Sequence, residues 1–179
     1  MNTQPLSFNP IQYISTQEKQ SIANLSISSL LAVAHEPLPQ GGNHWSIYLT
    51  SETGYVRLDM TPSYTVPATV SPGGSKGILI VSRVDDLRLG TASKTVRLDV
   101  REGLKVSDFV DLLVREKRHL YEFNNAGQGC RFWVHHQIGL CWDEGLVVNG
   151  VQVEEARSAI LVMYPEMVGY SLVVGEYYS

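Results

Sequence analysis

Alternation of hydrophobic and polar residues is clearest in residues 43–50, which read NHWSIYLT. His44 and Tyr48 fall on one side of this segment, and Trp45 falls on the other. Such a period of two predicts a half-buried β-strand. The turn-forming residues SETG and a second alternating run, YVRLDM, follow directly. The pattern therefore predicts a β-hairpin.

Several other segments are apolar or alternating in the same way, and we expect strands in them. They are residues 27–35, 77–84, 94–100, 120–123 and 169–177. The run GILIVSRV, which starts at Gly77, is apolar enough to be expected at the centre of the sheet. Residues 62–77 contain three prolines and the pair Gly73 and Gly74, so we expect a long loop there.

Other segments carry apolar residues at helical spacing. Residues 107–114 (SDFVDLLV) begin with Ser107, which suits a helix N-cap, and continue with an apolar stripe. Helical spacing resumes at Cys130 and continues to Cys141. Shorter helices are predicted over residues 15–22 and 154–163.

Together these elements predict an α+β domain in which an antiparallel sheet packs against two or three helices. A length of 179 residues suits a single domain, 1–179, that buries its own core. Residues 1–24 are polar and mixed, with Pro5 and Pro10, and we expect a loosely ordered N-terminal segment there.

The composition is that of an ordinary globular protein, with 44% hydrophobic and 18% charged residues. The net charge of −4 gives no reason to expect a nucleic-acid partner. No apolar run approaches the roughly 18 residues that a membrane span needs. The N-terminus lacks the basic and apolar regions of a secretory signal, so we expect a cytoplasmic protein. The composition does not specify an oligomeric state.

The two cysteines, Cys130 and Cys141, are expected to be reduced thiols. On one helix their Cα atoms would lie about 16 Å apart, which excludes a disulfide. Cys130 follows the small residues AGQG and would occupy the first turn of its helix. Free backbone N–H groups and the helix dipole favour a thiolate there, which makes Cys130 a candidate nucleophile. The alternative is that Cys130 is a small buried hydrophobic residue.

A cysteine nucleophile needs a base, usually a histidine, and a third group that orients the base. His44 suits this role because it opens a strand just after Gly41 and Gly42. His135 and His136 are neighbours and point in different directions on a helix, so a metal site is not expected. No phosphate-loop or dinucleotide pattern is present either, and we expect no cofactor.

Two segments of the chain resemble a known enzyme superfamily. The hairpin NHWSIYLTSETGYVRLDMTPS is similar to that of the lecithin-retinol acyltransferase-like and phospholipase/acyltransferase proteins. The segment YEFNNAGQGCRFWVHHQIG is similar to their tyrosine-led NCEHFV helix. These families have the permuted papain-like (NlpC-like) fold, in which the histidine strand precedes the cysteine helix. The resemblance implies that fold here, with His44 as general base and Cys130 as acyl-accepting nucleophile.

The chain departs from these families at the remaining polar positions. The second hairpin strand has no histidine, and Arg57 or Asp59 is the nearest residue to that position. We expect Asp59 to orient His44, as a carboxylate does in a triad; the alternative is that it only pairs with Arg57. Gly129 replaces the asparagine before the cysteine, and Arg131 and Phe132 replace the Glu-His pair after it. No C-terminal hydrophobic anchor follows, so a membrane lipid is not the expected substrate.

The motifs NHWSIYL, VRLDM and GCRFWV also resemble a family of small uncharacterised proteins from filamentous fungi, and such families often accompany natural-product biosynthesis. Three functions fit these residues. The first is a biosynthetic enzyme in which Cys130 and His44 act on an acyl, thioester or amide bond of a small molecule. The second is a non-covalent isomerase or cyclase, for example of the Diels–Alder type, that uses the same cleft as a shaped pocket. The third is a non-catalytic binding domain. The residues expected to contact the substrate are Arg57, Tyr48, Tyr55, Trp133 and Gln128.

Overall fold

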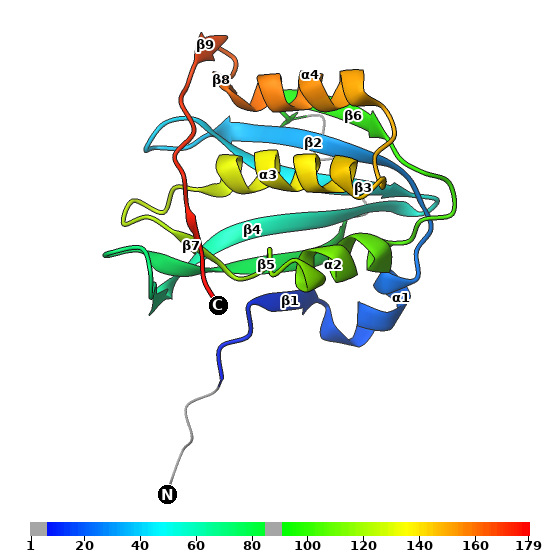
Figure 1. Ribbon diagram of the computed structural model, residues 1–179, viewed down its shortest axis with the longest axis horizontal. Helices are drawn as coiled ribbons and strands as arrows, with labels where there is room; N and C mark the ends of the chain where they lie inside the picture. Colours follow the sequence, from blue (N-terminus) through cyan, green and yellow to red (C-terminus); the bar gives the residue numbers. More distant parts are fainter. Residues whose placement is uncertain (1–6, 85–90) are drawn as a thin grey trace, which may run out of the picture.

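A sheet of eight strands with helices on one face forms the body of the molecule (Figure 1). The computed structural model describes residues 7–84 and 91–179. The strands are β1 (Ile11–Ile14), β2 (Ile27–Pro37), β3 (Asn43–Ser51), β4 (Gly54–Pro67), β5 (Ser75–Val84), β6 (Lys94–Asp99), β7 (Tyr121–Phe123), β8 (Val162–Met163), β9 (Val168–Gly169) and β10 (Glu176–Tyr177). The helices are α1 (Lys19–Ala23), α2 (Val106–Arg115), α3 (Cys130–Asp143) and α4 (Gly150–Ile160), and the 3₁₀ turn η1 spans Thr16–Glu18.

The order of strands along the sheet is β10-β7-β5-β4-β3-β2-β6. These strands pair antiparallel, whereas β1 pairs parallel with β5. The predicted α+β class and antiparallel sheet are confirmed, and the described residues form four α-helices instead of two or three. Residues 11–23 of the supposedly loose N-terminal segment form β1, η1 and α1, and residues 1–6 lie outside the described part of the chain.

The long loop predicted over residues 62–77 is wrong. β4 continues to Pro67 and β5 begins at Ser75, so residues 68–74 alone connect them. Recorded pairing between β4 and β3 ends at Leu58. Because Pro62 lies beyond that point, its missing N–H costs the sheet no ladder hydrogen bond on the β3 side.

The first residues of α2 and α4 differ from the sequence prediction because the N-caps of these helices are not the residues that the sequence suggested. α2 has Lys105 as its N-cap, and the Asp108 carboxylate accepts from the Lys105 N–H at 2.7 Å, so Ser107 lies inside the helix. α4 begins at Gly150 because the Asn149 side chain accepts from the first free N–H groups of that helix.

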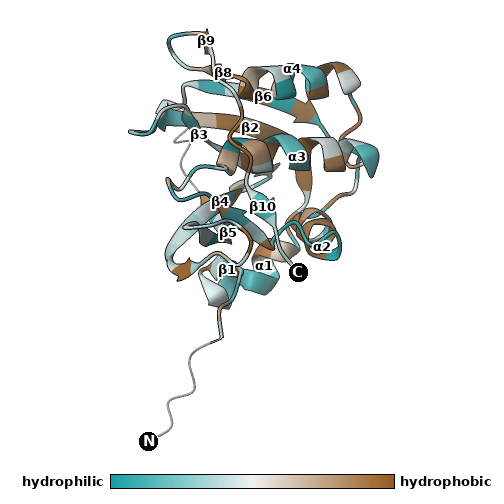
Figure 2. Cartoon of the chain, turned by 60° about the vertical axis from the view of Figure 1, so that its left-hand side comes forward, coloured by the Kyte–Doolittle hydropathy of each residue, from teal (hydrophilic) through white to brown (hydrophobic). Residues whose placement is uncertain are grey.

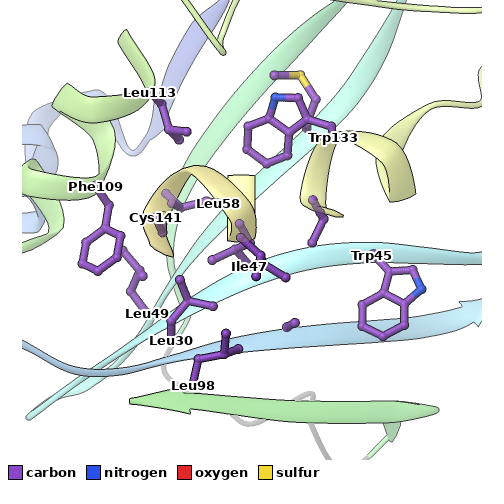
Figure 3. Close-up of a cluster of buried hydrophobic side chains, with 14 of the residues drawn as sticks. Leu30, Trp45, Ile47, Leu49, Leu58, Leu98, Phe109, Leu113, Trp133 and Cys141 are labelled. Atoms are coloured by element: carbon purple, nitrogen blue, oxygen red, sulfur yellow. The ribbon is translucent and has the colours of Figure 1, made fainter. Parts of the chain in front are cut away.

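The core lies between the sheet and its helices, and Figure 3 shows part of it. Trp45, Ile47 and Leu49 project from β3 towards Trp133 and Cys141 of α3, and all five are buried. In Figure 2 hydrophobic residues are prominent along β2, whereas α3 carries both hydrophobic and hydrophilic residues. None of the helices in the described ranges is long and apolar enough to cross a membrane.

Candidate active site

Cys130 is the first residue of α3, and the backbone before it is tightly fixed. Gly129, the N-cap, has φ 149°, and a Cβ at this position would lie 3.0 Å from Tyr121 Oη. That hydroxyl donates to the Gly129 carbonyl at 2.8 Å and accepts from the Gly175 N–H at 3.0 Å. Glycine therefore satisfies both a left-handed backbone and a close contact here.

His44 and Asp59 meet where β3 has separated from β4. The last recorded pair of the ladder is Ile47 with Leu58, so His44 lies beyond its end. His44 Nε2 is 2.6 Å from Asp59 Oδ1. Two further groups of the same face fix this carboxylate: the Ser46 hydroxyl donates to Oδ1 at 2.9 Å, and Arg57 Nη2 lies 2.9 Å from Oδ2.

These contacts keep Asp59 ionised. Burial alone would raise the pKa of Asp59, but the hydrogen bonds and the positive charges of His44 and Arg57 lower it below its usual value. A carboxylate accepts hydrogen bonds and cannot donate them, so His44 Nε2 must be the donor. The other ring nitrogen, Nδ1, then carries the lone pair whenever the imidazole is neutral.

The Cys130 thiol lies close enough to the His44 ring to affect its protonation. Burial lowers the pKa of His44, but the hydrogen-bonding and charge interactions with Asp59 and Cys130 outweigh burial and raise it to about 10. The structure thus brings together the three residues that the sequence analysis selected as a catalytic group. Because Asp59 occupies Nε2, Nδ1 is the nitrogen available to the thiol.

A narrow cavity of about 20 Å³ adjoins the thiol. It is mostly apolar at the Leu38 and Val173 side, and Gln128 lines it next to the helix start. Tyr170 covers Gly41 at its rim and donates to the Gln40 carbonyl at 3.3 Å. A more open pocket of about 460 Å³ lies on the other side of His44, lined by His35, Glu36, Pro37, Leu38, His44 and Thr91. Within residues 7–84 and 91–179, no three His, Cys, Asp or Glu side chains are placed to hold a metal ion.

The predicted substrate contacts lie in different places. Gln128 lines the cavity beside Cys130, and Arg57 is engaged with Asp59. Tyr48 is 2% exposed and packs against Tyr55 on the face of the sheet that does not carry α3. Trp133 is fully buried in the core and donates to the Arg118 carbonyl at 2.8 Å.

Arg131 and Asn43 are site residues that the sequence analysis did not select. Arg131 is 6% exposed, and its guanidinium donates to the carbonyls of Ile160, Tyr170 and Ser171. Asn43 is fully buried and bridges β3 to the backbone of Tyr164. An arginine inside the apolar run CRFWV was the available signal for Arg131, whereas nothing local in the sequence pointed to Asn43.

Comparison with protein families places residues 30–178 in a family described as "Domain of unknown function (DUF7770)". The chain belongs to this family. The region that defines the DUF7770 family here includes His44, Asp59 and Cys130. No curated protein and no solved structure matches the chain significantly.

Proposed function

We propose that this DUF7770 protein is a cysteine-dependent enzyme that acts on an acyl, thioester or amide bond of a small molecule. The observation that carries the proposal is the contact of His44 Nε2 with the Asp59 carboxylate, in a ring whose pKa the nearby Cys130 thiol also raises. A nucleophile, a base and a group that orients the base are the parts that such chemistry requires. A histidine strand that precedes a cysteine helix also agrees with a permuted papain-like arrangement, which we include in the proposal.

The reaction uses atoms that lie within this group. Because the pKa of His44 is raised to about 10, Nδ1 already holds the thiol proton in the resting site at neutral pH, and Cys130 Sγ then attacks the carbonyl carbon of the substrate. The N–H groups in the first turn of α3 have no acceptor within the helix and stabilise the oxyanion. When the tetrahedral intermediate collapses, the leaving group takes the proton from His44 and a thioester to Cys130 remains. Water or an acceptor molecule then attacks that thioester and releases the thiol.

Alkylation by iodoacetamide tests the proposal without knowledge of the substrate. We expect Cys130 to react at least tenfold faster than Cys141, because burial in the core raises the pKa of Cys141 to about 12. The variant His44→Gln should slow alkylation of Cys130 itself, and the matched control Cys141→Ala should leave the Cys130 rate unchanged. Equal and slow alkylation of both cysteines would contradict the proposal.

The non-covalent alternative makes a different prediction for the same residue. If the cleft acts only as a shaped pocket, Cys130→Ser retains most of the turnover once a substrate is found, whereas the covalent mechanism loses it. Of the residues assigned to that pocket, His44 borders the open pocket of about 460 Å³, and Trp133 lies in the core.

A further inference from the structure

A second pocket lies along the later turns of α3, away from Cys130. Its volume is about 260 Å³, and α3 and α4, which run side by side in Figures 1 and 2, provide most of its lining. Gly139, one of the lining residues on α3, is roughly 14 Å along the helix axis from Cys130. We call it the α3–α4 pocket; its lining residues are Arg118, His135, His136, Gly139, Leu140, Trp142, Asp143 and Arg157.

The arginines of the α3–α4 pocket have no carboxylate partner. Among the ion pairs of the described residues, none involves Arg118 or Arg157. Arg118 Nε is buried and has no hydrogen-bond acceptor in the described structure. Arg157 Nε donates to His135 Nε2 at 3.2 Å, which is a neutral acceptor. Two guanidinium groups therefore face one pocket, and Asp143 is the carboxylate among its lining residues.

The side chains around these arginines are held in place. The Arg118 guanidinium lies 5.0 Å from the centre of the Tyr177 ring, and His136 stacks on the same ring at 5.8 Å. His136 Nδ1 is 3.2 Å from the Tyr177 hydroxyl. Trp142, which is 43% exposed, adds an apolar wall. Fixed guanidinium groups beside an aromatic wall suit a phosphate attached to a small organic group.

We propose that the α3–α4 pocket binds the phosphate group of a small phosphomonoester through Arg118 and Arg157. A phosphate accepts several N–H donors at once, which would balance both guanidinium charges. The site is independent of the cysteine chemistry proposed above, because it shares no side chain with Cys130, His44 or Asp59.

The charges around the histidines also predict how binding depends on pH. Burial and the charges of Arg118 and Arg157 lower the pKa of His136. Burial, Arg157 and His136 lower the pKa of His135, against the opposing charge of Glu154. A bound anion would offset the arginines and raise the pKa of His136, so binding of sulfate, whose charge is constant, should be tighter at pH 5.5 than at pH 8.

The experiment is a titration of the full chain with phenyl phosphate, inorganic phosphate and sulfate at constant ionic strength, followed by the NMR signal of the His136 ring. Sulfate is included because its charge does not change between pH 5.5 and 8. We expect saturable shifts, with phenyl phosphate binding more tightly than the two inorganic ions. Arg118→Gln and Arg157→Gln should each weaken binding at least tenfold. The control Arg97→Gln, on the exposed side of β6, should leave it unchanged.

The melting temperature of each variant shows whether a loss of binding results from unfolding. Arg118→Gln removes a contact with Tyr177 and is expected to melt somewhat lower, whereas Arg157→Gln keeps the core intact. Loss of binding in a folded Arg157→Gln variant supports the site. Shifts that do not saturate, or that all variants share equally, would overturn it.

Discussion

Asp59 holds together three groups that β3 and β4 present on one side of the sheet: His44, Ser46 and Arg57. Each contact has a separate effect on the proposed chemistry. The bond to His44 fixes which ring nitrogen carries the proton, and the bonds from Ser46 and Arg57 fix the carboxylate itself. The residue thus acts on the thiol through His44 and is a positioning residue.

Replacing Asp59 with Asn tests that role. The variant Asp59→Asn loses the negative charge and a strong acceptor, so the pKa of His44 should fall from about 10 towards its ordinary value. Alkylation of Cys130 at pH 7 should slow by about tenfold or more, since one pKa unit changes a protonation ratio tenfold. An NMR titration of the His44 ring measures the first effect. Asp99→Asn, on β6, is the control, and an unchanged His44 titration in Asp59→Asn would refute the assigned role.

Two short segments beside the site are each held by one buried charged side chain. Glu122 holds residues 68–74, and Arg131 holds the segment that follows α4. Glu122 of β7 is fully enclosed and accepts four hydrogen bonds from the connection between β4 and β5. They come from the backbone N–H and hydroxyl of Thr69 and from the N–H groups of Val70 and Ser71, at 2.6 to 2.9 Å. This carboxylate replaces the strand pairing that residues 68–74 lack.

Glu122→Gln should therefore destabilise the protein in a pH-dependent way. Burial raises the pKa of Glu122, but the four hydrogen bonds outweigh burial and lower it below its ordinary value of 4.5. A lowered pKa gives stability that is present above pH 4.5 and disappears as pH falls through the folded-state value.

At pH 7 we expect a loss of about 2 kcal/mol in the free energy of unfolding, the scale of hydrogen bonds to a charged group. Urea unfolding at pH 7 and pH 3 measures it: the gap between Glu122→Gln and the wild type should shrink at the lower pH. Glu102→Gln, in an exposed turn, controls for the loss of one charge. A gap of equal size at both pH values would contradict this account of Glu122.

Arg131 likewise holds the segment that follows α4, through hydrogen bonds from its guanidinium to backbone carbonyls. Arg131→Met keeps much of the apolar stem but leaves the carbonyls of Ile160, Tyr170 and Ser171 without their donor. We expect a loss of about 3 kcal/mol or more in unfolding free energy. We also expect faster cleavage by chymotrypsin after Tyr170, measured by limited proteolysis and mass spectrometry. Arg97→Met removes only an exposed ion pair and should change neither result.

At the scale of the whole molecule, local patterns were enough to predict the elements that carry the proposed catalytic group. The alternation around His44 predicted β3, and the small residues before Cys130 predicted the start of α3, because each signal lies within a few residues. The same alternation put Arg57 and Asp59 on one face. That Arg57 and Asp59 would lie near Cys130 could be expected only from the resemblance to a known family.

Long-range contacts were outside what the sequence could predict. The Asn43 side chain binds the backbone of Tyr164, 121 positions away, and no periodic pattern encodes such a pair. The strand expected over residues 169–177 is wrong for a related reason. There the Tyr170 and Ser171 carbonyls accept from Arg131 instead of from a neighbouring strand, so only the short β9 and β10 remain. The loop predicted over residues 62–77 was wrong because a proline costs a strand a hydrogen bond only where a neighbouring strand would accept from its missing N–H.

The clasp that Arg131 and Asn43 form with residues 160–171 also sets an order of events in time. Hairpins such as β3–β4 join residues that are close in sequence and are expected to form early, whereas the contact of Asn43 with Tyr164, across 121 positions, closes a large loop and is expected to form late. The environment of Cys130 is therefore completed after most of the sheet exists. During refolding, the circular dichroism signal of the secondary structure should recover before Cys130 regains its fast alkylation.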